Sequence, residues 1–90
     1  MLPLLFEFVG TFVFFYVIAN VGDPLSIAAA FFGAVVFAAK VSGAHLNPGV
    51  SFMMFLLKNI NGTQLVQYAL VQLLAATCVV VLRNSQALLS

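Results

Sequence analysis

The sequence predicts an all-α membrane protein with three transmembrane helices and one re-entrant half-helix. The chain has 90 residues, of which 64% are hydrophobic and only 6% charged, with a mean hydropathy of +1.21. A chain of this length cannot bury so much apolar surface in a core of its own. Three apolar runs, at residues 2–21, 25–41 and 65–82, are close to the ~17–25 residues that a helix needs to cross a bilayer. The sequence thus forms a single unit of helices that lies in a membrane.

The first run, residues 2–21, is predicted to be a retained span and not a signal peptide. No Lys or Arg precedes it, and Glu7 falls inside the apolar stretch. The run is also longer than the ~7–15 residues of a signal-peptide core. An ionisable side chain inside a span is costly, so Glu7 is a candidate for a functional role. It shares one helix face with Gly10 and Thr11.

The other two spans carry stripes that indicate how the helices pack. Small residues recur at four-residue spacing along residues 25–41, which allows close approach of membrane helices. Polar residues recur in the same way at the start of residues 65–82 and are expected to face the bundle interior. Thr63 is the expected N-cap of this last span. The two stripes are Ala30, Ala34 and Ala38, and Gln64, Tyr68 and Gln72.

A fourth apolar piece, residues 50–57, is too short to cross the membrane. As a helix it would be only ~12 Å long, against a hydrocarbon core of ~30 Å. Asn47 is a good N-cap, Pro48 suits the first helical position, and Lys58 stands where the helix dipole favours a cation. An interfacial helix is the alternative, but residues 52–57 are apolar all round and lack a charged face. We therefore predict a re-entrant loop and half-helix over residues 42–57.

The backbone before this half-helix is predicted to be irregular at membrane depth. Residues 42–45 read Ser-Gly-Ala-His. Irregular backbone is tolerated there only where protein buries it or where it lines a water-filled cavity. This pattern indicates a pore or a substrate site.

Two motifs in this order resemble one family. The stretch EFVGTFVFF at residues 7–15 is followed, across a second span, by SGAHLNPGV at residues 42–50. Together they resemble the first half of an aquaporin, of the major intrinsic protein family of water and glycerol channels. VQLLAA at residues 71–76 is similar to the third helix of that family. The resemblance covers essentially the whole chain and implies an aquaporin-like half-barrel.

The resemblance assigns pore-lining roles to the loop. Asn47, Pro48 and Gly49 would occupy the Asn-Pro-Ala motif, with the amide nitrogen of Asn47 donating to a passing oxygen atom. The carbonyls of Gly43, Ala44 and His45 would form a ladder of acceptors. The positive end of the half-helix dipole would disfavour cations and protons, and the channel is expected to exclude ions and protons.

Three further assignments follow from the resemblance. Glu7 would accept hydrogen bonds from the loop and support it, together with Gln72. Counting back from Asn47 places Ile27 at the narrow selectivity constriction. An aliphatic side chain there does not determine the width of the filter. His45 is expected to pack and hydrogen-bond in the loop and not to bind a metal, since no second ligand lies nearby in the sequence. No cofactor is expected.

Two departures from the family pattern matter. The motif ends in Gly49 where the family has alanine, which removes a methyl group and loosens the first helical turn. Complete members have six spans and two Asn-Pro motifs, whereas this sequence has three spans and one. Three explanations are open. The chain is a fragment that has lost its second half, or it pairs with a separate chain that supplies a second half-channel, or two copies associate in opposite orientations. Complete channels of the family would form tetramers.

The predicted function is a passive channel, or half of one, for water and small neutral solutes such as glycerol, in the cell or plasma membrane. The alternatives are a truncated, non-transporting membrane fragment and a small proton-coupled exporter that uses Glu7. The scattered charges, with a net charge of +1, exclude a nucleic-acid partner. We expect no enzyme activity, because Ser42 and His45 have no orienting carboxylate beside them in sequence, although the fold could bring Glu7 close to them.

Overall fold

The computed structural model describes residues 1–89 and confirms the predicted all-α fold. The helices follow in the order α1 (Leu2–Asn20), α2 (Pro24–Ser42), α3 (Pro48–Leu56) and α4 (Gly62–Leu89). Three of them, α1, α2 and α4, are long and apolar enough to cross a membrane. The short helix α3 is ~14 Å long.

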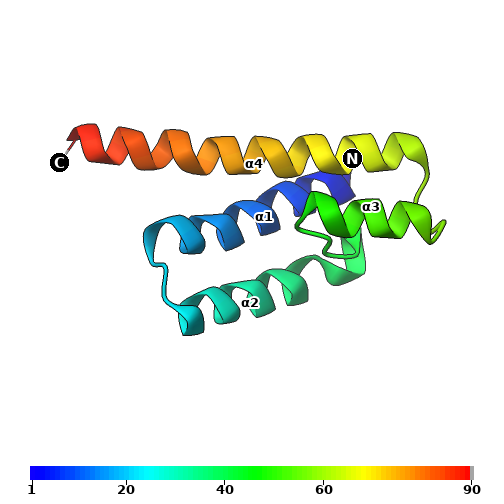
Figure 1. The fold of residues 1–90 in the computed structure, drawn as a ribbon, viewed down its shortest axis with the longest axis horizontal. Helices are drawn as coiled ribbons and strands as arrows, with labels where there is room; N and C mark the ends of the chain where they lie inside the picture. The colour runs from blue at the N-terminus through cyan, green and yellow to red at the C-terminus, as the bar shows by residue number, and fades with distance from the viewer. Residues whose placement is uncertain (90) are drawn as a thin grey trace.

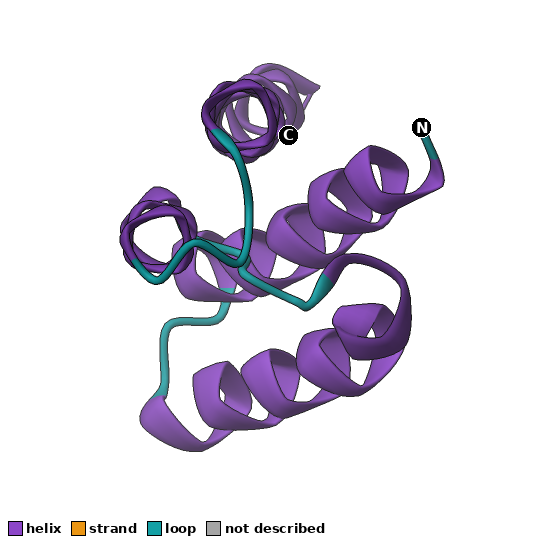
Figure 2. Cartoon of the chain, turned by 90° about the vertical axis from the view of Figure 1, so that its right-hand side faces the viewer, coloured by secondary structure: helices purple, strands orange, loops and turns teal. Residues whose placement is uncertain are grey.

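Helix α1 lies at the centre of the arrangement and packs against both α2 and α4, while α3 packs against α4. Figure 1 shows that α2 runs to the right-hand end of the molecule, where the chain turns back between the helices. Helix α3 then returns to that same end, and α4 starts from there. Seen from that end, the irregular segment between α2 and α3 lies among the four helices (Figure 2). The stretch from the end of α2 to the start of α4 therefore begins and finishes at the same end of the molecule, as expected of a re-entrant segment.

Local capping explains where α2 begins and ends. The backbone N–H of Ser26 donates to the Asp23 carboxylate at 2.8 Å, and Pro24 occupies the first turn. This hydrogen bond holds the pKa of Asp23, in the exposed turn, below its ordinary value. At the other end, Gly43 adopts a left-handed conformation with φ +87° and terminates the helix.

Helix α4 differs from the predicted span at both ends. Thr63 is not its N-cap: the side chain of Asn61 accepts from the N–H of Gln64 at 2.8 Å, and the side chain of Gln64 accepts from the N–H of Asn61 at 2.9 Å. This reciprocal pair is a capping box, which satisfies two backbone donors at once. The helix also runs on to Leu89, beyond the predicted residue 82, because the polar residues from Arg83 onwards end an apolar run without breaking a helix.

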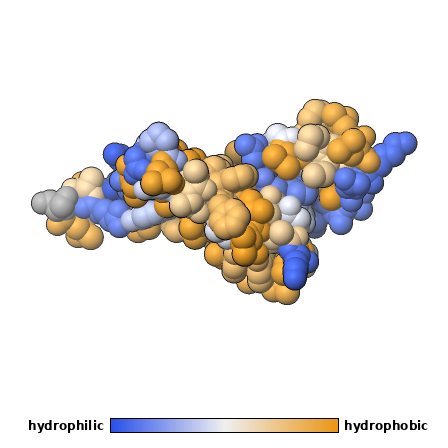
Figure 3. Space-filling model, turned by 90° about the horizontal axis from the view of Figure 1, so that it is seen from below, coloured by the Kyte–Doolittle hydropathy of each residue, from blue (hydrophilic) through white to orange (hydrophobic). Residues whose placement is uncertain are grey.

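Among residues 1–89 the interior contains as many buried polar side chains as buried apolar ones, and most of the apolar surface faces outward. Only 17% of the most apolar part of α1 and of α2, and 22% of that of α4, is buried within the chain. Figure 3 shows hydrophobic side chains over much of the middle of the molecule and hydrophilic groups toward its ends. The predicted stripes contribute to the interior, except that Gln64 is exposed and Ala30 only partly buried. The buried polar residues are Glu7, Thr11, Ser42, His45, Ser51 and Gln72.

Candidate functional site

The segment between α2 and α3, residues 43–47, contains three residues with positive φ, whereas Ser42, predicted to be irregular, is the last residue of α2. Ala44 and Leu46 have φ of +50° and +59°, and Gly43 has +87°. For a residue with a side chain, this left-handed conformation costs about 1–2 kcal/mol. Such a segment keeps its shape only if contacts from the rest of the fold stabilise it.

Glu7 supplies these contacts from the first helix. Its side chain is 0% exposed. One carboxylate oxygen, Oε2, accepts from Ser42 Oγ at 2.6 Å and from the N–H of His45 at 3.0 Å. The other, Oε1, accepts from the N–H of Leu46 at 2.9 Å and from Gln72 Nε2 at 3.0 Å. The single buried carboxylate therefore joins α1, the irregular segment and α4.

A second set of hydrogen bonds fixes the start of α3. Ser51 Oγ lies 2.8 Å from His45 Nδ1 and accepts from Gln72 Nε2 at 3.0 Å. The hydroxyl of Tyr68 donates to the carbonyl of Ser42 at 2.8 Å, and its ring contacts that of His45 with centroids 4.8 Å apart. The His45 ring is buried at 6% exposure. Its side chain is therefore part of the support, and only its backbone carbonyl remains a candidate pore group.

Leu46 fixes the segment sterically against the first helix. Its side chain is fully buried, and its Cδ2 atom would lie 2.8 Å from a Cβ atom placed on Gly10. The same imagined Cβ would come within 3.8 Å of Ala38 on α2. The absence of a side chain at Gly10 is what admits Leu46 between α1 and α2.

Two buried polar atoms of this region have no hydrogen-bond partner, namely Thr11 Oγ1 and Gln72 Oε1. A rotated Gln72 amide would not help, because its oxygen would then face the oxygen of Glu7. The orientation of Gln72 is thus determined by the carboxylate, which leaves its own oxygen unpaired.

Asn47 caps α3 with its oxygen and leaves its nitrogen free. The side-chain oxygen accepts from the N–H of Gly49 at 2.7 Å, and Pro48 occupies the first turn. Among the residues that the structure describes, no hydrogen bond involves Asn47 Nδ2. Asn47 is exposed. The amide nitrogen can therefore donate to a molecule outside the chain.

The backbone carbonyls before Asn47 are also available. Within residues 1–89, none of the hydrogen bonds ends on the carbonyl oxygen of Gly43, Ala44 or His45. The site therefore offers carbonyl acceptors beside one amide donor, a set suited to a neutral hydrogen-bonding molecule.

The structure does not bring Ile27 to this site. Ile27 lies in the first turn of α2, sixteen residues before Gly43, which corresponds to ~24 Å along the helix axis. There it lines an apolar concavity of about 510 Å³ with Phe14 and Phe31. Its assignment to a constriction stays a prediction.

Sequence reasoning missed the residues that support the segment from nearby. Ser51 could have been found as the single hydroxyl in the apolar helix α3. Leu46 gave no signal, because one more leucine in an apolar sequence is uninformative. Ser42 was weighed only as a nucleophile, yet its hydroxyl donates to Glu7, and the His45 ring faces Ser51.

The fold and the site define a multi-pass integral membrane protein with a re-entrant half-helix supported by a buried carboxylate. The Major intrinsic protein family model matches residues 23–87. The chain belongs to this family, whose members are channels and not enzymes. The motif-based resemblance is thereby confirmed.

Plant aquaporins are among the similar proteins. Aquaporin PIP1-3/PIP1-4 of Zea mays is 34% identical over 89 aligned positions, which cover 80% of this chain and 30% of the maize protein. Probable aquaporin PIP1-4 of Arabidopsis thaliana is 36% identical over 91 positions, covering 80% and 31%. Aquaporin PIP1.1 of Vicia faba is 35% identical over the same number of positions. The chain thus spans about a third of the length of these relatives, and no solved structure matches it.

Proposed function

We propose that this chain forms one half of a transmembrane channel for water and small neutral solutes, with Asn47 as the central donor. The proposal rests on the capped start of α3. There the side-chain oxygen of Asn47 accepts a hydrogen bond from the N–H of Gly49 at 2.7 Å, and the side-chain nitrogen has no partner among the described residues. A water molecule or a hydroxyl group moving along the free carbonyls of residues 43–45 would meet that nitrogen. The carbonyl ladder and the donor together replace the hydrogen bonds that the solute loses on leaving bulk water.

Exclusion of cations and protons follows from the same geometry. Helix α3 begins at Pro48, and its N-terminal end carries roughly half a positive elementary charge. A cation at Asn47 would meet this positive end and a donor, without an acidic partner, because the carboxylate of Glu7 is buried behind the segment. Glu7 and Gln72 support the site in this proposal and do not touch the solute.

A pore in a bilayer must be enclosed by protein on all sides, and one half-channel cannot enclose it. The proposal therefore includes a second half-channel. Much of the apolar surface of α1, α2 and α4 is exposed within this chain, and the relatives are about three times as long. A separate chain, or a second copy in the opposite orientation, would complete the pore. We further propose the plasma membrane as its location and a tetramer of complete channels as its assembly.

A proton-coupled exporter is disfavoured by the surroundings of Glu7. Each of its oxygens already accepts two hydrogen bonds from fixed groups, and its side chain has no exposed surface. A carrier that takes up and releases protons needs access from water.

Osmotic shrinkage of proteoliposomes tests the proposal with Asn47→Asp. This variant keeps the oxygen that caps α3 and removes the amide donor, so the helix still forms while the central contact is lost. We expect water flux to fall strongly in Asn47→Asp and to stay unchanged in the control Asn84→Asp, an exposed asparagine on α4. If the chain alone conducts no water, the same pair is tested in a chimaera with the remaining part of the maize relative. Equal flux through wild type and Asn47→Asp in the conducting form would refute the proposal.

The choice between water and glycerol is tested at Ile27. Phenylalanine in its place would narrow the path near Phe14 and Phe31. We expect Ile27→Phe to reduce glycerol flux more than water flux. An equal reduction of glycerol flux and water flux would show that Ile27 does not lie at the constriction.

A further inference from the structure

The concave surface between the end of α3 and the start of α4 takes no part in the proposed channel. We name it the α3–α4 corner and define it as the part of residues 55–64 that lines a hollow of about 670 Å³. It is lined by the apolar residues Phe55, Leu56 and Ile60 and by polar residues that include Lys58, Asn59 and Asn61. We propose that the α3–α4 corner binds an anionic phospholipid, with Lys58 at the phosphate and the apolar walls along the acyl chain.

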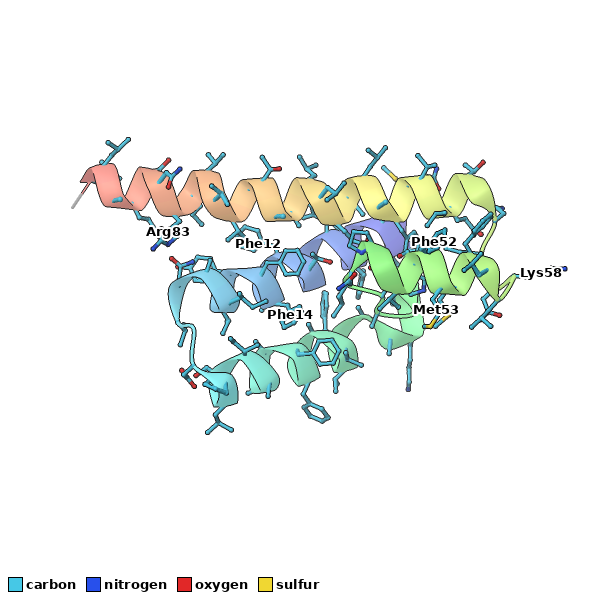
Figure 4. The ribbon with its side chains drawn as sticks, viewed as in Figure 1. Phe12, Phe14, Phe52, Met53, Lys58 and Arg83 are labelled. Atoms are coloured by element: carbon cyan, nitrogen blue, oxygen red, sulfur yellow. The ribbon has the colours of Figure 1, made fainter. Side chains whose placement is uncertain are left out.

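The position of Lys58 supports this proposal. Figure 4 shows its side chain pointing outward beyond the end of α3. The corner lies where the apolar helix α4 begins, which is at one boundary of the hydrocarbon layer. A lysine at this depth keeps its aliphatic stem against apolar surface and its amine among the lipid headgroups. An acyl chain can reach the walls formed by Leu56 and Ile60 from the same layer.

The distribution of charge supplies the complementarity. Glu7 is buried, and Asp23 lies in the α1–α2 turn at the opposite end of the molecule (Figure 1). The chain has no other acidic residue, so among residues 1–89 there is no exposed carboxylate near Lys58. A phosphate from the membrane is the anion that this surface lacks.

The backbone of the corner points the same way. Lys58 has φ +66°, at a position just after a helix where glycine is usual and costs less. A lysine here retains a side chain at an energetic cost that glycine would avoid. An outlier of this kind is a reason to look for a function of the side chain.

Native mass spectrometry of the purified chain in detergent tests the proposal. Equimolar phosphatidylglycerol and phosphatidylcholine with identical acyl chains are added, and the bound lipid is counted. We expect wild type to prefer phosphatidylglycerol, Lys58→Gln to reduce that preference about fivefold, and Lys58→Arg to keep it. Lys40→Gln makes the same change of charge outside the hollow and is expected to keep it too.

Three results would overturn the proposal. Equal retention of both lipids by wild type would show that the corner has no preference for anions. An equal loss in Lys40→Gln would show a diffuse charge effect, and displacement of phosphatidylglycerol by inorganic phosphate would show a site for the free anion. Circular dichroism of each variant checks the fold, and Lys58→Gly, which relaxes the backbone, must also lose the preference. These readouts are independent of transport, so the proposed channel can fail while the lipid site stands.

Discussion

Two irregular segments flank α3, and they maintain unusual backbone conformations by different means. Residues 43–47 contain two left-handed non-glycine residues, and residues 57–61 contain one, Lys58. The first segment is held by Glu7, which lies 38 residues before His45 in the sequence. The second is exposed and uses neighbours only: the N–H of Asn59 donates to the carbonyl of Met54, and Asn61 pairs with Gln64.

The comparison teaches that backbone strain of similar size has a different meaning in the two places. In the first segment the left-handed residues position carbonyls and Asn47, and the surrounding fold must keep them there. In the second the conformation follows from the local ending of a helix, and only the presence of lysine, where glycine would cost less, calls for a function of the side chain. Substitutions at Glu7, Gly10 and Lys58 test this distinction.

The largest effect is expected from Glu7→Gln. The amide nitrogen would face either the N–H of His45 or that of Leu46, and at least one buried backbone donor would lose its acceptor. Loss of such charge-assisted hydrogen bonds, with a donor left unpaired, costs about 3 kcal/mol. The free energy of unfolding, measured by titration with sodium dodecyl sulfate in mild detergent micelles, should fall accordingly.

Asp23→Asn is the matched control for Glu7→Gln. It makes the same chemical change at an exposed carboxylate, where only the cap of α2 depends on it, and asparagine is an equally good N-cap. We expect almost no change in its unfolding free energy. Equal losses in both variants would mean that Glu7 does not hold the first segment.

The next effect concerns the contact between Gly10 and Leu46. Gly10→Ala would place a Cβ atom 2.8 Å from Leu46 Cδ2, and because Leu46 is fully buried it cannot swing aside. Overpacking of this kind costs about 1–3 kcal/mol. Gly33→Ala on α2 is the control, since nothing lies within 4 Å of its imagined Cβ, and it should gain up to ~1 kcal/mol. A gain in both variants would show that Leu46 can repack and does not fix the segment.

The helices were predictable because apolar length and capping residues are local properties. Residues 2–21, 25–41 and 65–82 mark α1, α2 and the membrane part of α4, and Asn47-Pro48 marks the start of α3. The continuation of α4 past Arg83 was missed, since hydropathy measures membrane depth and not helix length. Thr63 was predicted as the cap because threonine is a good capping residue, but Asn61 is the residue whose side chain forms the reciprocal pair with Gln64.

The site was predictable in part for a similar reason. Glu7 and Asn47 are conspicuous because a carboxylate and an Asn-Pro pair are rare in apolar sequence. Which of the donors meets which oxygen of Glu7 depends on how α1, α2 and α4 pack. The close fit of Leu46 over Gly10 also exists only in three dimensions, and no periodicity announces it.

The smallest effects on stability are expected from replacing a left-handed residue by glycine in each of the two segments. Lys58→Gly and Ala44→Gly both remove the side chain from a left-handed residue, which saves about 1–2 kcal/mol in the folded state. The greater freedom of glycine in the unfolded chain offsets most of this, so each variant should gain about 0.5 kcal/mol. Both are measured in zwitterionic detergent without added lipid, which removes any contribution from lipid bound at Lys58. If Lys58→Gly gains and Ala44→Gly loses stability, the methyl group of Ala44 contributes packing, and the first segment is then stabilised by shape as well as by Glu7.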